Sequence, residues 1–155
     1  MLFDALVQAI QSLNSEDAFR PRLDAAQWKT LSTYLTRHEI RAGDLLIKQG
    51  DVDRTAYFLG QGSLQVFMTG GAPGSSRIAI LRAGAIIGET GLFADGPRSS
   101  NVEAMTPCVV FALRLPRFEE LMARVPLVAA EVLRAAGNVM VVRQRSNLSR
   151  QVPAA

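Results

Sequence analysis

One acid and one arginine stand out in the middle of this sequence because glycines and small hydroxyl residues surround them. The stretch GETGLFADGPRSSNV carries Glu89 and Arg98 nine positions apart. Backbone amides at a glycine-rich turn, together with an arginine guanidinium, are groups that converge on a phosphate. A carboxylate so close to a phosphate needs a donor to face, such as a sugar hydroxyl. These residue types and their spacing therefore indicate a site for a ribose phosphate.

The same two charges allow an alternative without a ligand, in which Glu89 and Arg98 form an ion pair that braces a turn. The glycines and the proline between them do not require both charges, so we favour the anion site. There, one charge-assisted hydrogen bond from Arg98 to a phosphate would contribute roughly 1.5 to 3 kcal/mol. When the site is empty, we expect Glu89 to face Arg98.

The elements that must position these residues are predicted from apolar spacing and turn residues. Residues 1–14 predict a short helix, and a second helix follows Asp24, an N-cap with Gln27 three positions later. From His38 onward, frequent glycines separate short β-branched runs, which is typical of an antiparallel barrel or roll. We place strands at HEIRA, DLLIKQ, TAYFLG, SLQVFMT, RIAILRA, NVEAMT and CVVFALR.

Two helices are predicted after the strands, each opened by a proline. Pro116 begins the first, and Pro126 begins a longer one that reaches about Leu148. Along the longer helix, apolar residues recur at heptad spacing, which favours a homodimer seam; the alternative is that this stripe packs on the roll. The stripe consists of Val128, Val132, Ala135, Val139 and Val142.

The composition fits one globular domain. The chain has 155 residues, 48% of them hydrophobic and 20% charged, and no apolar run approaches the roughly 20 residues of a membrane-spanning helix. Its start lacks the basic opening of a signal peptide, so we expect a cytoplasmic location. The net charge is +3, and the arginines are scattered except for a group near the end, which indicates a solvated helix end or a contact for an acidic partner. That group is Arg143, Arg145 and Arg150.

The counts of reactive residues argue against catalysis. The single histidine, His38, cannot make a two-histidine metal site or leave a base for a nucleophile, and the single cysteine, Cys108, cannot hold an iron–sulfur cluster. We therefore expect no enzyme activity, no metal and no cofactor. Cys108 is predicted to lie buried in a strand.

The sequence resembles the cyclic nucleotide-binding domains of bacterial catabolite regulators, protein kinase A regulatory subunits and cyclic nucleotide-gated channels, over about residues 20–148. The most specific part is the family's phosphate-binding cassette, in which Gly-Glu is followed by a helical turn and then by Pro-Arg and small residues. It is matched here by Gly88, Glu89, Pro97, Arg98, Ser99, Ser100 and Val102. The stretch GDVDRTAYFLGQGSLQVF, which begins at Gly50, is similar to the turn and strand pair of such domains. Thr90 and Gly91 depart from the family's usual leucine or isoleucine and alanine.

The resemblance implies a role for each residue of the site. Glu89 would accept from the ribose 2'-hydroxyl, and Arg98 would hold the cyclic phosphate together with the backbone amides of Gly91 and Ser99 and the Ser99 hydroxyl. Val66 and Ile78 would line the base pocket. Arg143, on the last helix, would fold over the purine, with a solvated surface charge as the alternative.

The fold and function follow from the same resemblance. We predict an antiparallel β roll with N-terminal helices and a long C-terminal helix. A helical segment at residues 1–20 precedes the binding domain at 21–148, and a frayed tail follows at 149–155. Within the binding domain, we expect the roll at about 38–114 and the C-terminal helices at about 116–148. The predicted function is a cAMP sensor that relays binding through its last helix to an unknown downstream protein. We expect no direct DNA binding. Alternatives are cGMP or a cyclic dinucleotide as ligand, a scaffold that binds no ligand, and the sensory half of a transcription regulator or channel.

Overall fold

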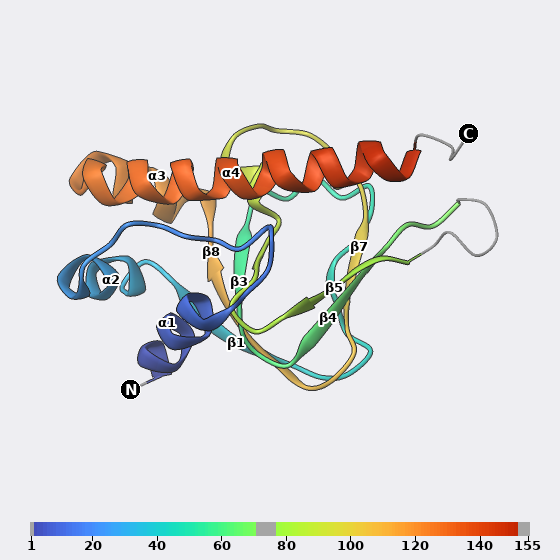
Figure 1. Ribbon diagram of the computed structural model, residues 1–155. Coiled ribbons are helices and arrows are strands. Elements are labelled where there is room, and N and C mark those ends of the chain that lie inside the picture. The colour runs from blue at the N-terminus through green and yellow to red at the C-terminus, as the bar shows by residue number, and fades with distance from the viewer. Residues whose placement is uncertain (1, 71–76, 152–155) are drawn as a thin grey trace.

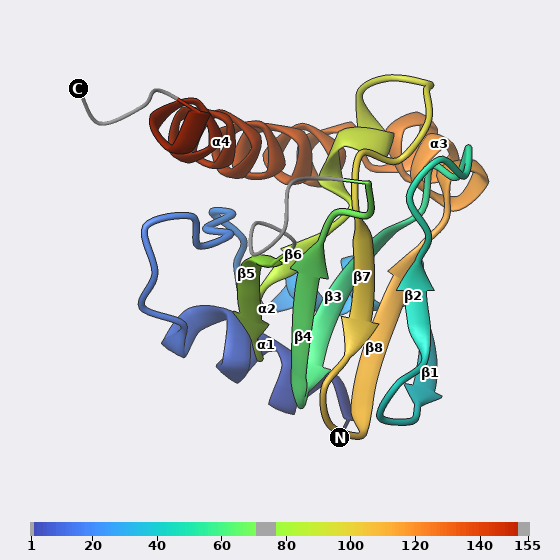
Figure 2. The ribbon, with the colours of Figure 1, turned by 90° about the vertical axis from the view of Figure 1, so that its right-hand side faces the viewer.

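In the described part of the chain, eight strands form two four-stranded sheets. The two sheets face each other (Figures 1 and 2). The computed structural model describes residues 2–70 and 77–151. The first sheet has the strand order β1-β8-β3-β6 and the second β2-β7-β4-β5, with antiparallel pairing throughout. The strands are β1 (Thr36–Ile40), β2 (Leu45–Ile47), β3 (Ala56–Gln61), β4 (Ser63–Phe67), β5 (Arg77–Arg82), β6 (Ile86–Ile87), β7 (Asn101–Ala104) and β8 (Cys108–Leu113).

The antiparallel roll predicted from the sequence is confirmed, and all seven predicted strands are present. The facing sides of the two sheets bury one apolar cluster, which includes Leu59, Leu64 and Val110. Cys108 lies buried in the same cluster, as predicted. The strand β6 was not predicted, because two residues are too short to show alternation.

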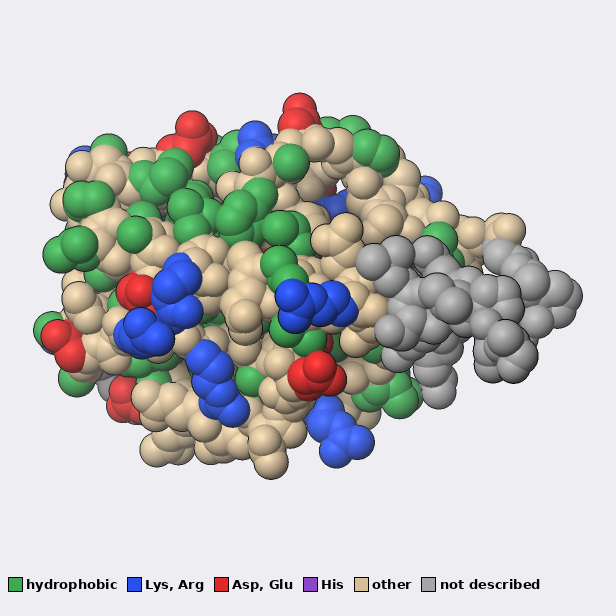
Figure 3. All heavy atoms as spheres, turned by 45° about the horizontal axis from the view of Figure 1, so that its top comes forward, with side chains coloured by type: hydrophobic (Ala, Val, Ile, Leu, Met, Phe, Trp, Pro, Cys, Tyr) green, Lys and Arg blue, Asp and Glu red, His purple; other side chains and the backbone are tan. Residues whose placement is uncertain are grey.

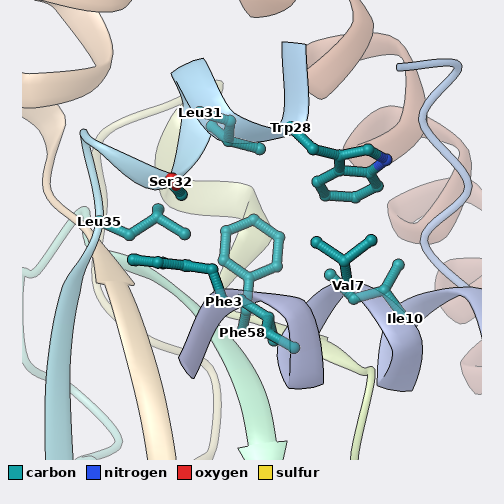
Figure 4. A pocket seen from close by; sticks show the side chains of 9 residues that line it. Phe3, Val7, Ile10, Trp28, Leu31, Ser32, Leu35 and Phe58 are labelled. Carbon is teal, nitrogen blue, oxygen red and sulfur yellow. The ribbon is translucent and has the colours of Figure 1, made fainter. Parts of the chain in front are cut away.

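The N-terminal helices cover the outer face of β3. The first helix is α1 (Leu2–Ser12), and the second is α2 (Ala25–Ser32), which begins with the predicted capping box between Asp24 and Gln27. Their apolar side chains close around Phe58 of β3 and leave a void of only about 10 Å³ (Figure 4). Such a void is the size of about one water molecule, so this interface is a packed core and offers no room for a ligand.

The C-terminal helices are α3 (Leu115–Arg124) and α4 (Pro126–Gln151), each opened by a proline as predicted. Helix α4 lies across one end of the roll (Figures 1 and 2) and ends three residues beyond the predicted Leu148; residues 152–155 lie outside the described residues. No helix in the described part of the chain is both long and apolar enough to cross a membrane.

The homodimer seam predicted along α4 is wrong as to the residues involved. Val128, Val132, Ala135 and Val139 are buried in the same core cluster as Phe58 and Phe118, and Val142 is half-buried. This stripe packs on the body of the protein, which is the alternative considered from the sequence. Heptad spacing marks an apolar helix face and does not identify what that face packs against.

Candidate functional site

The cassette begins where β6 ends, at Gly88. This glycine has φ +72°, in the left-handed region, and it turns the chain into the short 3₁₀ helix η1 (Glu89–Leu92). A Cβ at Gly88 would lie 2.9 Å from Nη1 of Arg98, so the position requires glycine for space as well as for backbone conformation. The turn leaves Glu89 as the first residue of η1, with only 5% of its surface exposed.

Arg98 is buried beneath this turn, with 7% of its surface exposed. Its Nη1 donates to the Gly88 carbonyl at 3.1 Å, and its Nη2 donates to the Thr55 carbonyl at 2.5 Å. Nη2 also lies 3.6 Å from the Asp53 carboxylate. These contacts hold one edge of the guanidinium against the wall of the roll, so its position is fixed before any ligand arrives.

The loop before β3 holds the cassette in place. The Arg98 amide donates to the Asp51 carbonyl, and the Gly50 amide donates to the Arg98 carbonyl, both at 2.8 Å. Nε of Arg54 donates to the Gly91 carbonyl at 2.8 Å. A Cβ at Gly91 would lie 2.8 Å from Cα of Arg54, so this backbone leaves no room for a side chain at position 91.

Glu89 accepts a short hydrogen bond from Nη1 of Arg143, on α4. The expectation that Glu89 faces Arg98 in the empty site is therefore wrong: no ion pair joins the two within the described residues, and Arg98 pairs with Asp53 instead. The physical reason is that α4 brings a second guanidinium over the cassette. The same arginine donates through Nε to Asp17 at 2.8 Å, so one side chain joins three distant segments.

Two guanidinium nitrogens at this site are buried and have no hydrogen-bond partner in the described structure. They are Nε of Arg98 and Nη2 of Arg143. An unsatisfied buried donor costs free energy, about 1 to 3 kcal/mol and more when it is charged. One of these donors belongs to an arginine of the cassette and the other to the arginine that binds Glu89. They favour the binding of an additional group that carries acceptors for the guanidiniums and a donor for Glu89.

The other predicted cassette residues differ in their exposure and in their backbone hydrogen bonds. Pro97 and Ser99 are exposed and Ser100 is half-buried. The Gly91 amide donates to the Gly88 carbonyl at 3.2 Å, so it is engaged within the turn. The Ser99 amide makes no hydrogen bond to a described residue and remains available to a ligand.

The two residues predicted to line a base pocket lie on neighbouring strands. Val66 lies on β4 and is half-buried, opposite Ala79 of β5 and Val102 of β7. Ile78 lies on β5 beside Ala79, but its side chain is outside the described residues. Both positions thus lie in the second sheet, together with β7, the strand that follows the cassette.

Sequence reasoning missed three residues of the site: Asp17, Asp53 and Thr55. Asp53 and Thr55 belong to the GDVDRT turn, whose similarity to the family was noted without a role for either. Asp17 gives no local signal, since its partner Arg143 is 126 positions away in the chain. Only the tertiary structure brings these segments together.

An open hollow of about 450 Å³ shares Asp53 and Thr55 with the groups that hold Arg98. It is lined by Asp53 and Thr55 together with residues of β1, β3 and β8, including His38 and Tyr57. Burial, followed by the charge of Asp53, raises the pKa of the Tyr57 hydroxyl. Within residues 2–70 and 77–151, no group of His, Cys, Asp and Glu side chains is arranged to hold a metal ion.

The comparison with protein families agrees with this geometry. Residues 37–125 match the model of the cyclic nucleotide-binding domain, which is more than half of the chain. The two antiparallel sheets and the cassette are thus those of a nucleotide-binding class of domain. The chain belongs to the cyclic nucleotide-binding domain family.

Individual relatives are similar over most of this chain. A cAMP-dependent protein kinase regulatory subunit of Blastocladiella emersonii is 29% identical over 118 residues, covering 76% of this chain and 28% of the relative. Potassium/sodium hyperpolarization-activated cyclic nucleotide-gated channel 3 of Mus musculus is 31% identical over 126 residues, covering 76% of this chain and 16% of the channel. The chain thus spans less than a third of either relative.

Solved structures show the same fold. A cyclic nucleotide-binding domain from Methylobacillus flagellatus superimposes with a TM-score of 0.81 at 20% identity, covering 99% of this chain and 85% of that one. The likeness includes the helices at both ends of the roll, because nearly the whole chain is covered.

Proposed function

We propose that this chain is a non-catalytic sensor module for a cyclic purine nucleotide, with cAMP as its preferred ligand. The observation that carries the proposal is the buried Nε of Arg98, which has no partner in the described structure although it lies in the cassette beside buried Glu89. A cyclic phosphate supplies the missing acceptor, and the ribose 2'-hydroxyl supplies the donor that Glu89 needs. Family membership and the two relatives named for cyclic nucleotides support the same ligand class.

In this proposal, each side chain of the site has a separate task. Arg98 and the free Ser99 amide bind the phosphate, and the Ser99 hydroxyl assists. Glu89 accepts from the sugar, while Val66 and Ile78 contact the base. Arg143 then moves from Glu89 toward the ligand, where its Nη2 gains a partner.

The relay through α4 is a population shift. The ligand replaces one of the contacts that Arg143 makes with the cassette, so it changes the relative free energy of the positions that α4 adopts. A ligand shifts such an equilibrium only by its difference in affinity between the two states. The downstream partner that responds to α4, and a cytoplasmic site of action, are part of the proposal.

The deciding experiment is a calorimetric titration with cAMP, cGMP and cyclic di-GMP. We expect binding of cAMP to the wild-type protein and at least a tenfold loss for Arg98→Gln, about 1.4 kcal/mol. Arg98→Lys should bind with intermediate affinity, because an ammonium keeps the charge but lacks the planar fork. The control is Arg37→Gln on β1, which removes a surface charge paired with Glu39. Unchanged affinity in folded Arg98→Gln would overturn the phosphate assignment, and absence of binding by wild type would favour the ligand-free scaffold.

Homodimerisation remains part of the proposal, but on another surface. Figure 3 shows hydrophobic side chains gathered on the face that carries α4. The large exposed hydrophobic residues of α3, α4 and the cassette loop are Met122, Leu127, Val141 and Phe93. Sedimentation equilibrium of wild type and Val141→Glu tests this surface, since a charge on it should separate a dimer into monomers.

A further inference from the structure

Asp17 lies in the segment between α1 and α2, and its carboxylate is held from both sides. Oδ2 accepts from Nε of Arg143 at 2.8 Å, and Oδ1 accepts from the Ser15 hydroxyl at 3.0 Å. The next two residues, Ala18 and Phe19, are buried, and the Phe19 ring lies 5.2 Å from that of Phe58 in β3. The packing of Phe19 fixes the backbone beside Asp17, so this carboxylate is a rigid anchor.

Arg143 needs such an anchor because its side chain is long. A free arginine side chain has about 2 kcal/mol of rotamer entropy, which is lost when its guanidinium is fixed at a site. The bond from Nε to Asp17 orients the guanidinium plane, with Nη1 on Glu89 and Nη2 buried without a partner among the described residues. One bond thus fixes the guanidinium of Arg143 while its Nη1 contacts Glu89 of the cassette.

We propose that Asp17 is a positioning residue for nucleotide binding, which keeps Arg143 at the cassette when the sugar hydroxyl takes over Glu89. This inference rests on the proposed function. Without Asp17, a ligand that occupied Glu89 would leave a half-buried guanidinium with no carboxylate partner. With Asp17, Arg143 keeps one ion pair and has two terminal nitrogens for acceptors on the ligand.

The ionisation of Asp17 supports this role. Burial alone would raise the pKa of Asp17, but the hydrogen bond and the charge of Arg143 outweigh it, so the pKa lies below its ordinary value. The carboxylate therefore remains charged at neutral pH. Asp17 belongs to the segment between α1 and α2, far from the cassette in sequence. The Asp17–Arg143 contact therefore links nucleotide binding at the cassette to this N-terminal segment.

The test is a double-mutant cycle on the affinity for cAMP, with Asp17→Asn, Arg143→Gln and the double variant. We expect Asp17→Asn to weaken binding at least about threefold in the wild-type background and by less than about twofold when Arg143 is already glutamine. The matched control is Glu16→Gln, the same change of charge at an exposed neighbour, which should leave the affinity unchanged. Equal losses in both backgrounds, or no loss in either, would show that Asp17 does not act through Arg143.

A second measurement uses the ligand-free protein and separates positioning from folding. In nitrogen-edited NMR spectra, the Nε–H signal of Arg143 should be protected from exchange in wild type, Glu16→Gln and Glu89→Gln, and lost in Asp17→Ala, which removes the acceptor oxygen. Protection that survives in Asp17→Ala would overturn the proposal. If wild type binds cAMP and the cycle shows no coupling, only the role of Asp17 fails. If wild type binds no cyclic nucleotide, the proposed function fails and the binding role of Asp17 fails with it.

Discussion

Gly88 connects the backbone of the cassette to the position of Arg98, because it adopts a left-handed conformation directly against the guanidinium. We predict that Gly88→Ala costs more stability than Gly43→Ala and also weakens nucleotide binding about fivefold, roughly 1 kcal/mol. Gly43 is the matched control, since its φ is +91° and a Cβ there would meet nothing within 4 Å. The backbone strain of about 1 to 2 kcal/mol is then common to both variants.

The measurements for this pair are urea unfolding and calorimetric titration. The extra loss in Gly88→Ala arises because its Cβ would lie 2.9 Å from Nη1 of Arg98 and 3.0 Å from the Thr55 carbonyl. Nη1 is part of the guanidinium, and the Thr55 carbonyl accepts from its Nη2. If Gly88→Ala and Gly43→Ala lost equal stability and nucleotide affinity were unchanged, the position of the Arg98 guanidinium would not depend on this close contact.

At the scale of elements, the sequence predicted the helices and strands well but not which surfaces of α4 are buried. The capping box at Asp24, the prolines that open α3 and α4, and the β-branched strands are local signals, and each was confirmed. The spacing of Glu89 and Arg98 is also local, so the cassette was found. Their partners Arg143 and Asp53 were not assigned as such, because those pairings depend on how the segments pack together.

The contact between η1 and α4 gives a prediction about stability. Phe93, which follows η1, packs beside Gly137, where a new Cβ would lie 3.5 Å from the Phe93 ring, an ordinary contact distance. Gly137→Ala should therefore raise the free energy of unfolding by about 0.5 to 1 kcal/mol, because alanine is favoured over glycine in a helix interior. The reciprocal control, Ala130→Gly at an exposed position of α4, should lower it by a similar amount. The free energy of unfolding is measured by urea unfolding. A lower value for Gly137→Ala than for wild type would mean that α4 and the cassette lie too close for a methyl group.

Across the whole molecule, the segment between α1 and α2 is tied to α4 at two places. One is the Asp17–Arg143 pair. At the other, the Glu131 carboxylate on α4 accepts from the Arg22 amide at 2.6 Å and from Nη2 of Arg134 at 2.9 Å. Arg134 also donates to the Arg20 carbonyl at 3.1 Å. The N-terminal segment is thus attached to the helix that is proposed to carry the signal, and both attachments depend on a charged carboxylate.

Acid should weaken both attachments. The hydrogen bond from Arg134, followed by that from the Arg22 amide, lowers the pKa of Glu131 from 4.5 to about 2, and the pKa of Asp17 is also lowered. A folded-state pKa below the unfolded value means that the unfolded chain binds more protons over this range, so stability falls as pH falls. The contribution is complete above about pH 4.5 and is lost as the pH decreases toward about 2.

We therefore predict that Glu131→Gln is less stable than wild type at neutral pH and that the difference shrinks steadily as the pH falls below 4.5. Because Glu131 lies at the surface, added salt should also narrow the difference. The control is Glu119→Gln on α3, because Glu119 is exposed and makes no ion pair within the described residues. The stability difference between Glu119→Gln and wild type should not shrink in this way as the pH falls. Urea unfolding at a series of pH values measures all three proteins. A pH-independent difference for Glu131→Gln would mean that its contacts contribute through packing and that the charge of Glu131 does not hold the N-terminal segment to α4.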